Sequence, residues 1–269
     1  MQFYKYESLG NNFILFDWLE KDENFISKKI RSSTWPSFVK KICKRNFGIG
    51  ANGVLILKKD SLSSLPISII FNSDGTKGYV CFNGIRCIAN HLFSKHKFPN
   101  QFDVLMGSKK INCKVDKEDI TTNVGLAKYI AERTIKIKNL DFIGHIVDVG
   151  NPHFVIFAKT TIEWLSVNGS YFENREAFPD KTNTEFVQQE EENSYNVLVY
   201  ERGCGITLAC SSGAAAIMKA LLEMKKIRTK EIISLKMPGG ELSSWIDENL
   251  NIYQKAKSHL VFDGNLNLN

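Results

Sequence analysis

Two segments of this chain resemble each other, and this internal repeat constrains the fold more than any other feature of the sequence. The stronger copy is ERGCGITLACSSGAAAIMKALL at 201–222, and the weaker copy is NSDGTKGYVCFNGIRCIANHL at 72–92. In each, a cysteine, Cys81 or Cys210, is followed three residues later by glycine and then by small and apolar residues with a helical period. The cysteines lie 129 residues apart (210 − 81). The repeat therefore predicts that each begins a helix in one of two similar halves.

A second pair of similar segments supports the duplication. GNNFILF at 10–16 resembles GNPHFVIF at 150–157. These two segments begin 140 residues apart (150 − 10) rather than 129, and an insertion or deletion of about eleven residues accounts for the difference. A chain of 269 residues with 43% hydrophobic content can bury one core in each half. We therefore predict two domains, the first at 1–117 with a returning strand at about 255–269, and the second at 118–254.

The position of each cysteine favours a reactive thiol. Unpaired N–H groups and the positive end of the helix dipole stabilise an anion at a helix N-terminus, which lowers the pKa of a thiol. A single free cysteine is more often a small residue of the core. Two in matching positions of a repeat favour a pair that acts together. Inversion at a carbon acid needs such a pair, because a thiolate removes a proton from one face while a thiol supplies one to the other.

Hydrophobic periodicity predicts mostly short strands and a few helices. Strands are expected at 2–6, 13–16, 54–57, 67–71, 101–105, 110–115, 120–126, 146–149, 154–157, 196–200, 232–236, 250–253 and 259–263. Helices are expected at 34–43, 85–95, 161–165 and 210–225, with a turn at 237–242. The glycine-rich run at 46–53 matches no nucleotide-binding motif and is interpreted as a loop that shapes a pocket.

Charge and hydropathy argue against several classes of protein. The net charge of +6 comes mostly from scattered lysines, without a basic helix or an RNA-reading aromatic motif, so we predict no nucleic-acid partner and only a weak preference for anionic substrates. The first residues contain no apolar signal segment, and no run approaches the ~18 apolar residues of a membrane span. We expect a soluble cytoplasmic protein that does not contact a membrane. A homodimer is compatible with the sequence but is not specified by it.

The six cysteines also raise the question of a zinc site. Cys81 and Cys87, like Cys204 and Cys210, have five residues between them, whereas paired zinc ligands are usually separated by two to four. Under the repeat only Cys81 and Cys210 correspond to each other. We therefore predict no metal and no cofactor, since a Schiff-base lysine in a phosphate-binding fold is not recognisable either. A duplicated structural protein with metal-bridged cysteines is the non-enzyme alternative.

Three further polar residues suit an amino-acid substrate. Glu201 and Arg202 precede Cys210 across a glycine-rich loop. A guanidinium can bind a carboxylate in a bidentate manner and Glu201 could hold an α-ammonium, although a surface ion pair would have the same sequence. His153 follows Asn151 and Pro152, and it could be a structural imidazole or a group that orients or deprotonates a cysteine.

These residues lie in segments that resemble, in the same order, the signature segments of the diaminopimelate epimerase family. The segments are SLGNNF, FGIGANGVL, FNSDGT, CFNGIRCIA, VGNPHFV, NTEFV, ERGCGITLACSSGAAA and MPGGEL, and they span nearly the whole chain. The resemblance implies an α+β fold of two pseudo-symmetric domains, each a mixed, barrel-like β-sheet around a central helix, with the active site in the cleft between them. It implies cofactor-independent epimerisation of LL- to meso-diaminopimelate in lysine and peptidoglycan precursor synthesis. A broader amino-acid racemase, acting for example on glutamate with the same two cysteines, is the alternative.

The resemblance also assigns roles to residues. Cys81 and Cys210 are the two bases, and His153 and Glu201 assist the thiols. The positions that contact substrate are Asn11, Asn72, Phe82, Asn83, Asn151, Asn183, Glu201, Arg202, Ser211 and Ser212, of which Phe82, Asn83, Ser211 and Ser212 contribute backbone N–H groups. The chain departs from the family's usual residues at Asn12, Asn52, Phe82, Cys204, Ile206, Ser211 and Ser212. Three of these changes remove carboxylates and two add a Cβ atom in place of glycine, so we expect altered substrate specificity.

Overall fold

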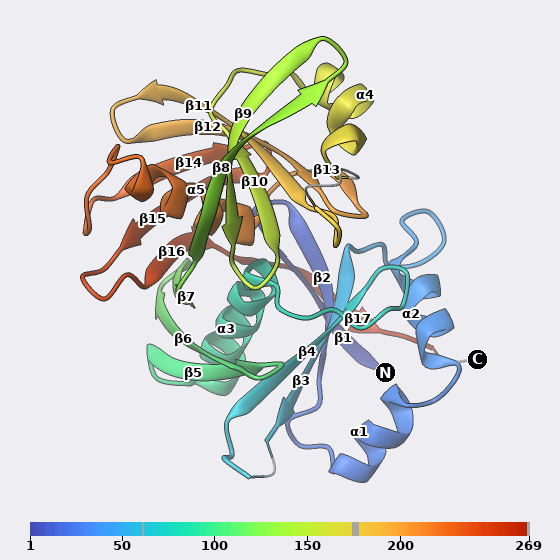
Figure 1. Ribbon diagram of the computed structural model, residues 1–269. Coiled ribbons are helices and arrows are strands. Elements are labelled where there is room, and N and C mark those ends of the chain that lie inside the picture. The colour runs from blue at the N-terminus through green and yellow to red at the C-terminus, as the bar shows by residue number, and fades with distance from the viewer. Residues whose placement is uncertain (61, 174–177, 268–269) are drawn as a thin grey trace. The chain divides into compact units, whose positions relative to one another are not determined.

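The computed structural model describes residues 1–60, 62–173 and 178–267 (Figure 1). It divides into two compact units, unit 1 with Met1–Thr122 and Ala256–Asn269, and unit 2 with Asn123–Lys255. The chain leaves unit 1 within strand β7 (Asp119–Gly125) and returns to it within strand β16 (Ile252–Lys257). Both ends of the chain therefore belong to unit 1.

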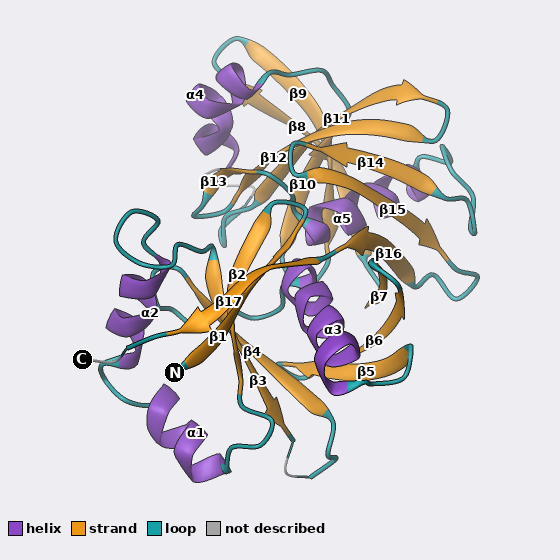
Figure 2. Ribbon diagram, turned by 180° about the vertical axis from the view of Figure 1, so that it is seen from behind, coloured by secondary structure: helices purple, strands orange, loops and turns teal. Residues whose placement is uncertain are grey.

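Unit 1 is a mixed sheet around a central helix. Its elements are β1 (Gln2–Ser8), β2 (Asn11–Asp17), α1 (Glu23–Ile30), α2 (Trp35–Cys43), β3 (Gly53–Lys59), β4 (Pro66–Asn72), α3 (Phe82–His96), β5 (Gln101–Met106), β6 (Lys109–Asp116), the first part of β7, and β17 (His259–Asn265). Neighbouring strands follow the order β17, β1, β2, β3, β4, β5, β6 and β7. The pairs β2–β3 and β4–β5 are parallel and the others antiparallel. Helix α3 packs against β1 to β6 and against β17 (Figure 2).

Unit 2 repeats this topology. Its elements are β8 (Lys128–Ile137), β9 (Leu140–Asp148), β10 (Pro152–Ile156), α4 (Ile162–Glu173), β11 (Asn183–Glu191), β12 (Ser194–Glu201), β13 (Gly205–Thr207), α5 (Ser211–Glu223), β14 (Ile233–Met237), β15 (Gly240–Ile246) and most of β16. The strand order is β8, β9, β10, β11, β12, β14, β15 and β16, with β10–β11 and β12–β14 parallel and the other pairs antiparallel. Helix α5 leads from β12 to β14 as α3 leads from β4 to β5. The predicted duplicated α+β fold is confirmed.

The two central helices are buried because of their composition. Ten of the fifteen residues of α3 are buried, and they lie on every side of the helix rather than on one stripe. This is the pattern of a helix enclosed by other elements. Helix α5 achieves the same burial with three consecutive alanines, Ala214, Ala215 and Ala216, whose small side chains allow the surrounding strands to approach closely.

Each unit has its own aromatic core. In unit 1, Phe16 stacks with Trp18 and meets Trp35 edge to face. In unit 2, Phe172 and Phe186 pack edge to face within a cluster that includes Phe154. These contacts bury large apolar surfaces and fix the positions of the sheets that carry the polar residues discussed below.

Several elements differ from those predicted. Helix α1 and strand β8 were not expected, and β9 begins at Leu140, before the strand expected at 146–149. The outward positions of β8 are mostly exposed, so its apolar alternation is weak, and α1 depends on a local cap in which Asp22 accepts a hydrogen bond from the N–H of Phe25. The turn expected at 237–242 is shorter, because β15 already begins at Gly240. Among the described residues, no helix is both long and apolar enough to span a membrane.

Candidate active site

Cys81 is the N-cap of helix α3, as predicted. Its backbone is extended (φ −134°, ψ 107°), and its carbonyl oxygen accepts the first helical hydrogen bond, from the N–H of Ile85 at 2.9 Å. Its own N–H donates to the sulfur of Met106 at 3.2 Å. The side chain is half-buried. The thiol therefore stands at the positive end of a fifteen-residue helix, where an anion is favoured.

Cys210 occupies the equivalent place in unit 2. It is the N-cap of α5 with nearly the same backbone conformation (φ −124°, ψ 110°). Its sulfur accepts a hydrogen bond from the N–H of Gly213 at 3.3 Å and lies 3.3 Å from the hydroxyl oxygen of Ser212. Unlike Cys81, the residue is buried. The repeat thus correctly predicted both helix starts.

The surroundings of Cys210 disfavour its thiolate. Burial raises the pKa of the Cys210 thiol well above its ordinary value, and the nearby carboxylates of Glu201 and Glu185 raise it further. The contacts with Ser212 and with the N–H of Gly213 act in the opposite direction but are weaker. The expectation of a lowered pKa is therefore wrong for this cysteine. The helix end does favour an anion, but burial and two negative charges outweigh it.

A positive charge accompanies Cys81 instead. Arg86 lies in the first turns of α3, is fully buried, and donates to the hydroxyl of Ser8 at 2.9 Å and to the side-chain oxygen of Asn83. Burial lowers the pKa of Arg86 to about 10, while its charge interacts favourably with Cys81 and Cys87. The guanidinium stays charged at neutral pH, so it favours an anion at Cys81. The two thiols thus have environments of opposite sign.

His153 and Glu185 form a buried pair beside Cys210. Nδ1 of His153, on β10, lies 2.7 Å from Oε1 of Glu185, on the parallel neighbour β11, and neither side chain is exposed to solvent. Nε2 of His153 and Oε2 of Glu185 are buried and make no hydrogen bond with the described part of the chain. Each ring nitrogen and each carboxylate oxygen normally finds a partner, so the two remaining atoms have unused capacity for a bound group.

Glu185 also touches the first turn of α5. A Cβ atom at Gly213 would lie 2.5 Å from Oε1 of Glu185, so any larger residue there would displace this buried carboxylate. The sequence-based site did not include Glu185. Its position two residues after Asn183 in a strand, and therefore on the same face, was the signal that could have identified it.

Glu201 ends strand β12 and faces the same region. Its Oε1 accepts a short hydrogen bond from the hydroxyl of Thr207, across the β12–β13 hairpin. Desolvation raises the pKa of Glu201, whereas hydrogen bonds from Thr207 and Cys210 and the nearby His153 lower it. The structure therefore brings His153, Glu185, Glu201 and Cys210 together within unit 2.

Asn183 connects two loops of this group. Its side-chain nitrogen donates to the carbonyl of Pro152 at 3.1 Å, and its side-chain oxygen accepts from the backbone N–H of Arg202 at 2.9 Å. Arg202 is exposed, and its guanidinium donates to the carbonyl of Asp180 at 2.8 Å. Asn151 is half-buried in the loop before β10. Since both ends of the Asn183 amide are engaged within the protein, this residue orients the loops that carry its predicted companions.

The predicted residues of unit 1 lie at the ends of strands and in the first turn of α3. Asn11 begins β2, and its side-chain oxygen is buried without a hydrogen-bond partner in the described chain. Asn72 ends β4 and donates to the hydroxyl of Thr76 at 3.0 Å. Phe82 and Asn83 form the buried first turn of α3. Asn11 therefore has an acceptor available, whereas Asn72 is held by its own turn.

The first turn of α5 carries Ser211 and Ser212. Ser211 is buried, and its carbonyl accepts from the side chain of Gln254 at 2.7 Å. Neither Ser211 nor Phe82 adopts a positive φ, so replacing the family's glycine at these positions costs no backbone strain. Of the other unusual residues, Cys204 is exposed, and Ile206 packs against the aromatic core of unit 2.

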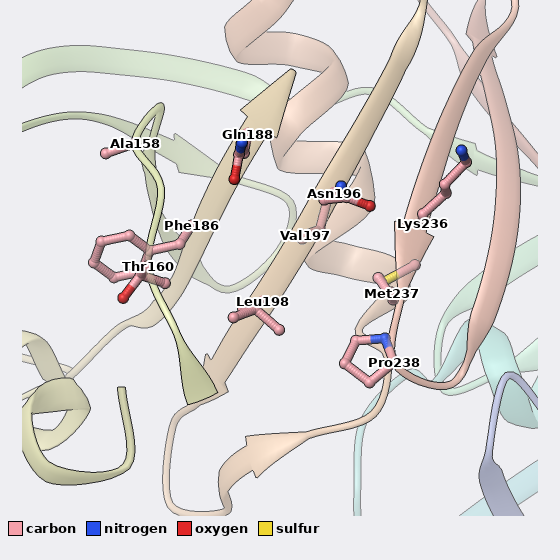
Figure 3. A pocket seen from close by; sticks show the side chains of 10 residues that line it. All are labelled: Ala158, Thr160, Phe186, Gln188, Asn196, Val197, Leu198, Lys236, Met237 and Pro238. Atoms are coloured by element: carbon pink, nitrogen blue, oxygen red, sulfur yellow. The ribbon is translucent and has the colours of Figure 1, made fainter. Parts of the chain in front are cut away.

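Two cavities of unit 2 do not include the predicted residues. One, with a volume of about 350 Å³, has Phe186, Leu198 and Met237 on its walls and the polar side chains of Gln188 and Lys236 nearby (Figure 3). Another, of about 560 Å³, is lined by residues 126–129 and by parts of β9 and α5. The predicted site residues described above lie outside both cavities.

Comparison with known proteins identifies similar sequences along the full length. The family model described as diaminopimelate epimerase matches residues 3–130 and 145–261. A diaminopimelate epimerase of Elusimicrobium minutum is 34% identical over 285 residues, with 98% of each chain covered. One from Rippkaea orientalis is 33% identical over 291 residues, covering 100% of this chain and 99% of the relative.

A solved structure has the same fold at much lower identity. A hydroxyproline epimerase from Agrobacterium vitis superimposes with a TM-score of 0.74 at 8% identity, covering 98% of this chain and 91% of the other. At that identity the likeness concerns the fold alone.

Proposed function

This chain belongs to the diaminopimelate epimerase family, and from that premise we propose that it converts LL-diaminopimelate to the meso isomer with Cys81 and Cys210 as the two bases. The enzyme is an isomerase, and the proposal places its reaction in lysine synthesis. The alternative of a duplicated structural protein is set aside because the family is one of enzymes.

One observation carries the two-base assignment. Cys81 and Cys210 are the N-caps of topologically equivalent helices, α3 and α5, in two units with the same strand order. A duplicated fold that presents one thiol per unit suits a reaction that needs one acid and one base on opposite faces of a carbon. Cys43 ends helix α2, Cys87 lies inside α3 and Cys113 lies in β6, so none of these three begins a helix as Cys81 and Cys210 do.

Electrostatics assigns the two roles. Arg86 favours an anion at Cys81, whereas Glu185, Glu201 and burial keep the Cys210 thiol protonated. In the LL to meso direction, the Cys81 thiolate therefore removes the α-proton and the Cys210 thiol donates its proton to the other face. The products are a Cys81 thiol, a Cys210 thiolate and the inverted carbon. The reverse reaction, or proton exchange with solvent, restores the starting state.

The groups that flank the thiols suit the substituents of an α-carbon. The first turns of α3 and α5 suit an α-carboxylate, since a helix N-terminus presents backbone N–H groups and the positive end of the helix dipole to an anion. Glu201 has the charge to hold an α-ammonium. Binding that cation would favour the ionised form of Glu201, whose pKa desolvation has raised.

Replacement of each thiol tests the proposal. Purified parent, Cys81→Ala and Cys210→Ala proteins are incubated with LL-diaminopimelate, and the isomers are separated chromatographically. Both variants should lose turnover by several orders of magnitude, while Cys204→Ser, which changes an exposed thiol, should keep it. Retention of most of the activity by either alanine variant would refute the pair of bases.

A further inference from the structure

A second polar cluster lies within unit 1 and takes no part in the proposed reaction. It consists of Asp17, at the end of β2, and of His91 and His96 on α3. Oδ2 of Asp17 lies 3.0 Å from Nε2 of His91 and 2.6 Å from Nε2 of His96. Among the described residues, they form the one group of three or more histidine, cysteine or acidic side chains whose possible ligand atoms all lie within 4.8 Å of one another.

The other polar atoms of the buried members are already held. Oδ1 of Asp17 accepts a hydrogen bond from the N–H of Leu19 at 3.2 Å. Nδ1 of His91 lies 3.2 Å from the hydroxyl of Tyr6. These contacts leave Oδ2 of Asp17 and Nε2 of His91 to face the centre of the cluster. Metal-binding histidines usually have such a partner on the second ring nitrogen, because it fixes the ring and its tautomer.

We propose that Asp17, His91 and His96 bind one divalent transition-metal ion of the Zn²⁺ class. Two imidazoles and a carboxylate are a donor set that suits zinc. Ligands at about 2.0–2.1 Å from a tetrahedral ion lie roughly 3.3 Å apart, so the observed separations from Oδ2 require only small side-chain movements.

Exposure provides a route for the ion and for a fourth ligand. The side chain of His91 is fully buried, whereas Asp17 is 18% and His96 is 28% exposed. Solvent can therefore reach one side of the cluster, where a water molecule completes the tetrahedron. The opposite side is closed by His91 and the ring of Tyr4, whose centroid lies 4.6 Å from that of His91.

Binding replaces hydrogen bonds by coordination bonds. Coordination needs the Nε2 lone pair of each histidine, so the ring proton resides on Nδ1, and Nδ1–H of His91 can then donate to the hydroxyl of Tyr6. The ion then links β2 to α3, the helix that has Cys81 at its N-cap. Its role is to hold this helix in unit 1, since none of the three ligands belongs to the proposed catalytic group.

Metal binding tests the proposal directly. The protein carries Cys81→Ala, Cys204→Ser and Cys210→Ala, so that accessible thiols do not compete, and it is first treated with a chelator. Zn²⁺ is titrated by calorimetry, and Co²⁺ serves as a spectroscopic probe. We expect one ion per chain and visible Co²⁺ bands of the strength typical of four-coordinate Co²⁺, without the near-ultraviolet thiolate charge-transfer band.

Single substitutions locate the site. Asp17→Asn and His96→Gln should each weaken Zn²⁺ binding by roughly tenfold or more. These two positions are partly exposed, and circular dichroism verifies that the variants are folded. His259→Gln removes a half-exposed histidine elsewhere in unit 1 and should bind like the parent. Failure to bind one ion, a thiolate band, or unchanged affinity in both Asp17→Asn and His96→Gln would overturn the proposal.

Discussion

Nδ1 of His153 lies 2.7 Å from Oε1 of Glu185, and both side chains are completely excluded from solvent. A carboxylate in such a place needs a polar or charged partner, and the imidazole supplies it. The pair links parallel strands β10 and β11 and leaves Nε2 of His153 with unused hydrogen-bonding capacity. It also places a negative charge close enough to Cys210 and Glu201 to raise the pKa of both.

Removal of that charge should make Cys210 easier to ionise. In Glu185→Gln, the amide oxygen can still accept a hydrogen bond from His153, but the negative charge that opposes the Cys210 thiolate is lost. The pKa of Cys210 should therefore fall. The pH dependence of its alkylation by iodoacetamide, followed by peptide mass spectrometry, should shift to lower pH.

A matched control exists in the same unit. Glu173→Gln also removes a largely buried carboxylate, but Glu173 pairs with Lys181 and does not affect the pKa of Cys210. Its alkylation profile should match that of the parent. An unchanged profile in Glu185→Gln would mean that this carboxylate does not control the thiol.

The close approach of Gly213 to Glu185 predicts a specific non-additivity. Gly213→Ala adds a methyl group 2.5 Å from a carboxylate oxygen and should destabilise the protein by about 1–3 kcal/mol. In Glu185→Ala the space is empty, so the same change should cost much less. Urea denaturation of the parent, both single variants and the double variant measures the coupling. Additive free energies of unfolding would contradict the contact.

The contrast between the two thiols predicts their order of modification. Cys81 is half-buried near Arg86, whereas Cys210 is buried near two carboxylates. In a Cys204→Ser background, iodoacetamide at neutral pH should label Cys81 well before Cys210. Arg86→Gln should slow the labelling of Cys81, and Arg86→Lys, which keeps the charge, should slow it less. Faster labelling of Cys210 would reverse the assigned roles of acid and base.

The helix starts were predictable from the sequence because a repeat aligns them locally. Each cysteine, the glycine three residues later and the following apolar run lie within one continuous segment, so periodicity alone places Cys81 and Cys210 at their N-caps. The same holds for the paired strands, whose order is duplicated. The duplication thus followed from short-range patterns that occur twice, whereas the arrangement of a mixed sheet around a central helix was implied by the family resemblance.

What the sequence did not reveal depends on contacts between distant segments. The raised pKa of Cys210 arises from burial and from Glu201 on β12 and Glu185 on β11, all of which depend on the folded sheet. Likewise, Asp17 meets His91 across 74 residues of chain. A local argument about the helix dipole could not weigh these charges, and it therefore gave the wrong direction for Cys210.

Selectivity should be broader in this protein than in relatives with the usual carboxylates. Asn12 accepts a hydrogen bond from buried Lys5 at 2.7 Å, and its own N–H donates to the side chain of Asn52 at 3.1 Å. A neutral residue at each of these positions weakens the orientation of the surrounding loops by ~1 kcal/mol. We expect slow turnover of glutamate beside diaminopimelate.

Two substitutions test this origin of broad selectivity. In Asn12→Asp and Asn52→Asp the ratio of kcat/KM for diaminopimelate to that for glutamate should rise several-fold, and Asn112→Asp, on β6, should leave it unchanged. If the parent turns over no other amino acid, the specificity argument fails, while the epimerase assignment is unaffected.

Solvent isotope incorporation tests the two-base mechanism most directly. The protein is incubated with LL-diaminopimelate in deuterated water, and the α-positions of product and remaining substrate are analysed by NMR and mass spectrometry at early times. A base on one face and a separate acid on the other predict that newly formed meso product carries one α-deuterium, while remaining LL substrate is still largely protiated. Cys81→Ala and Cys210→Ala should form no meso product. Meso product that retains its original α-proton at early times, or its formation by either variant, would contradict inversion by Cys81 and Cys210.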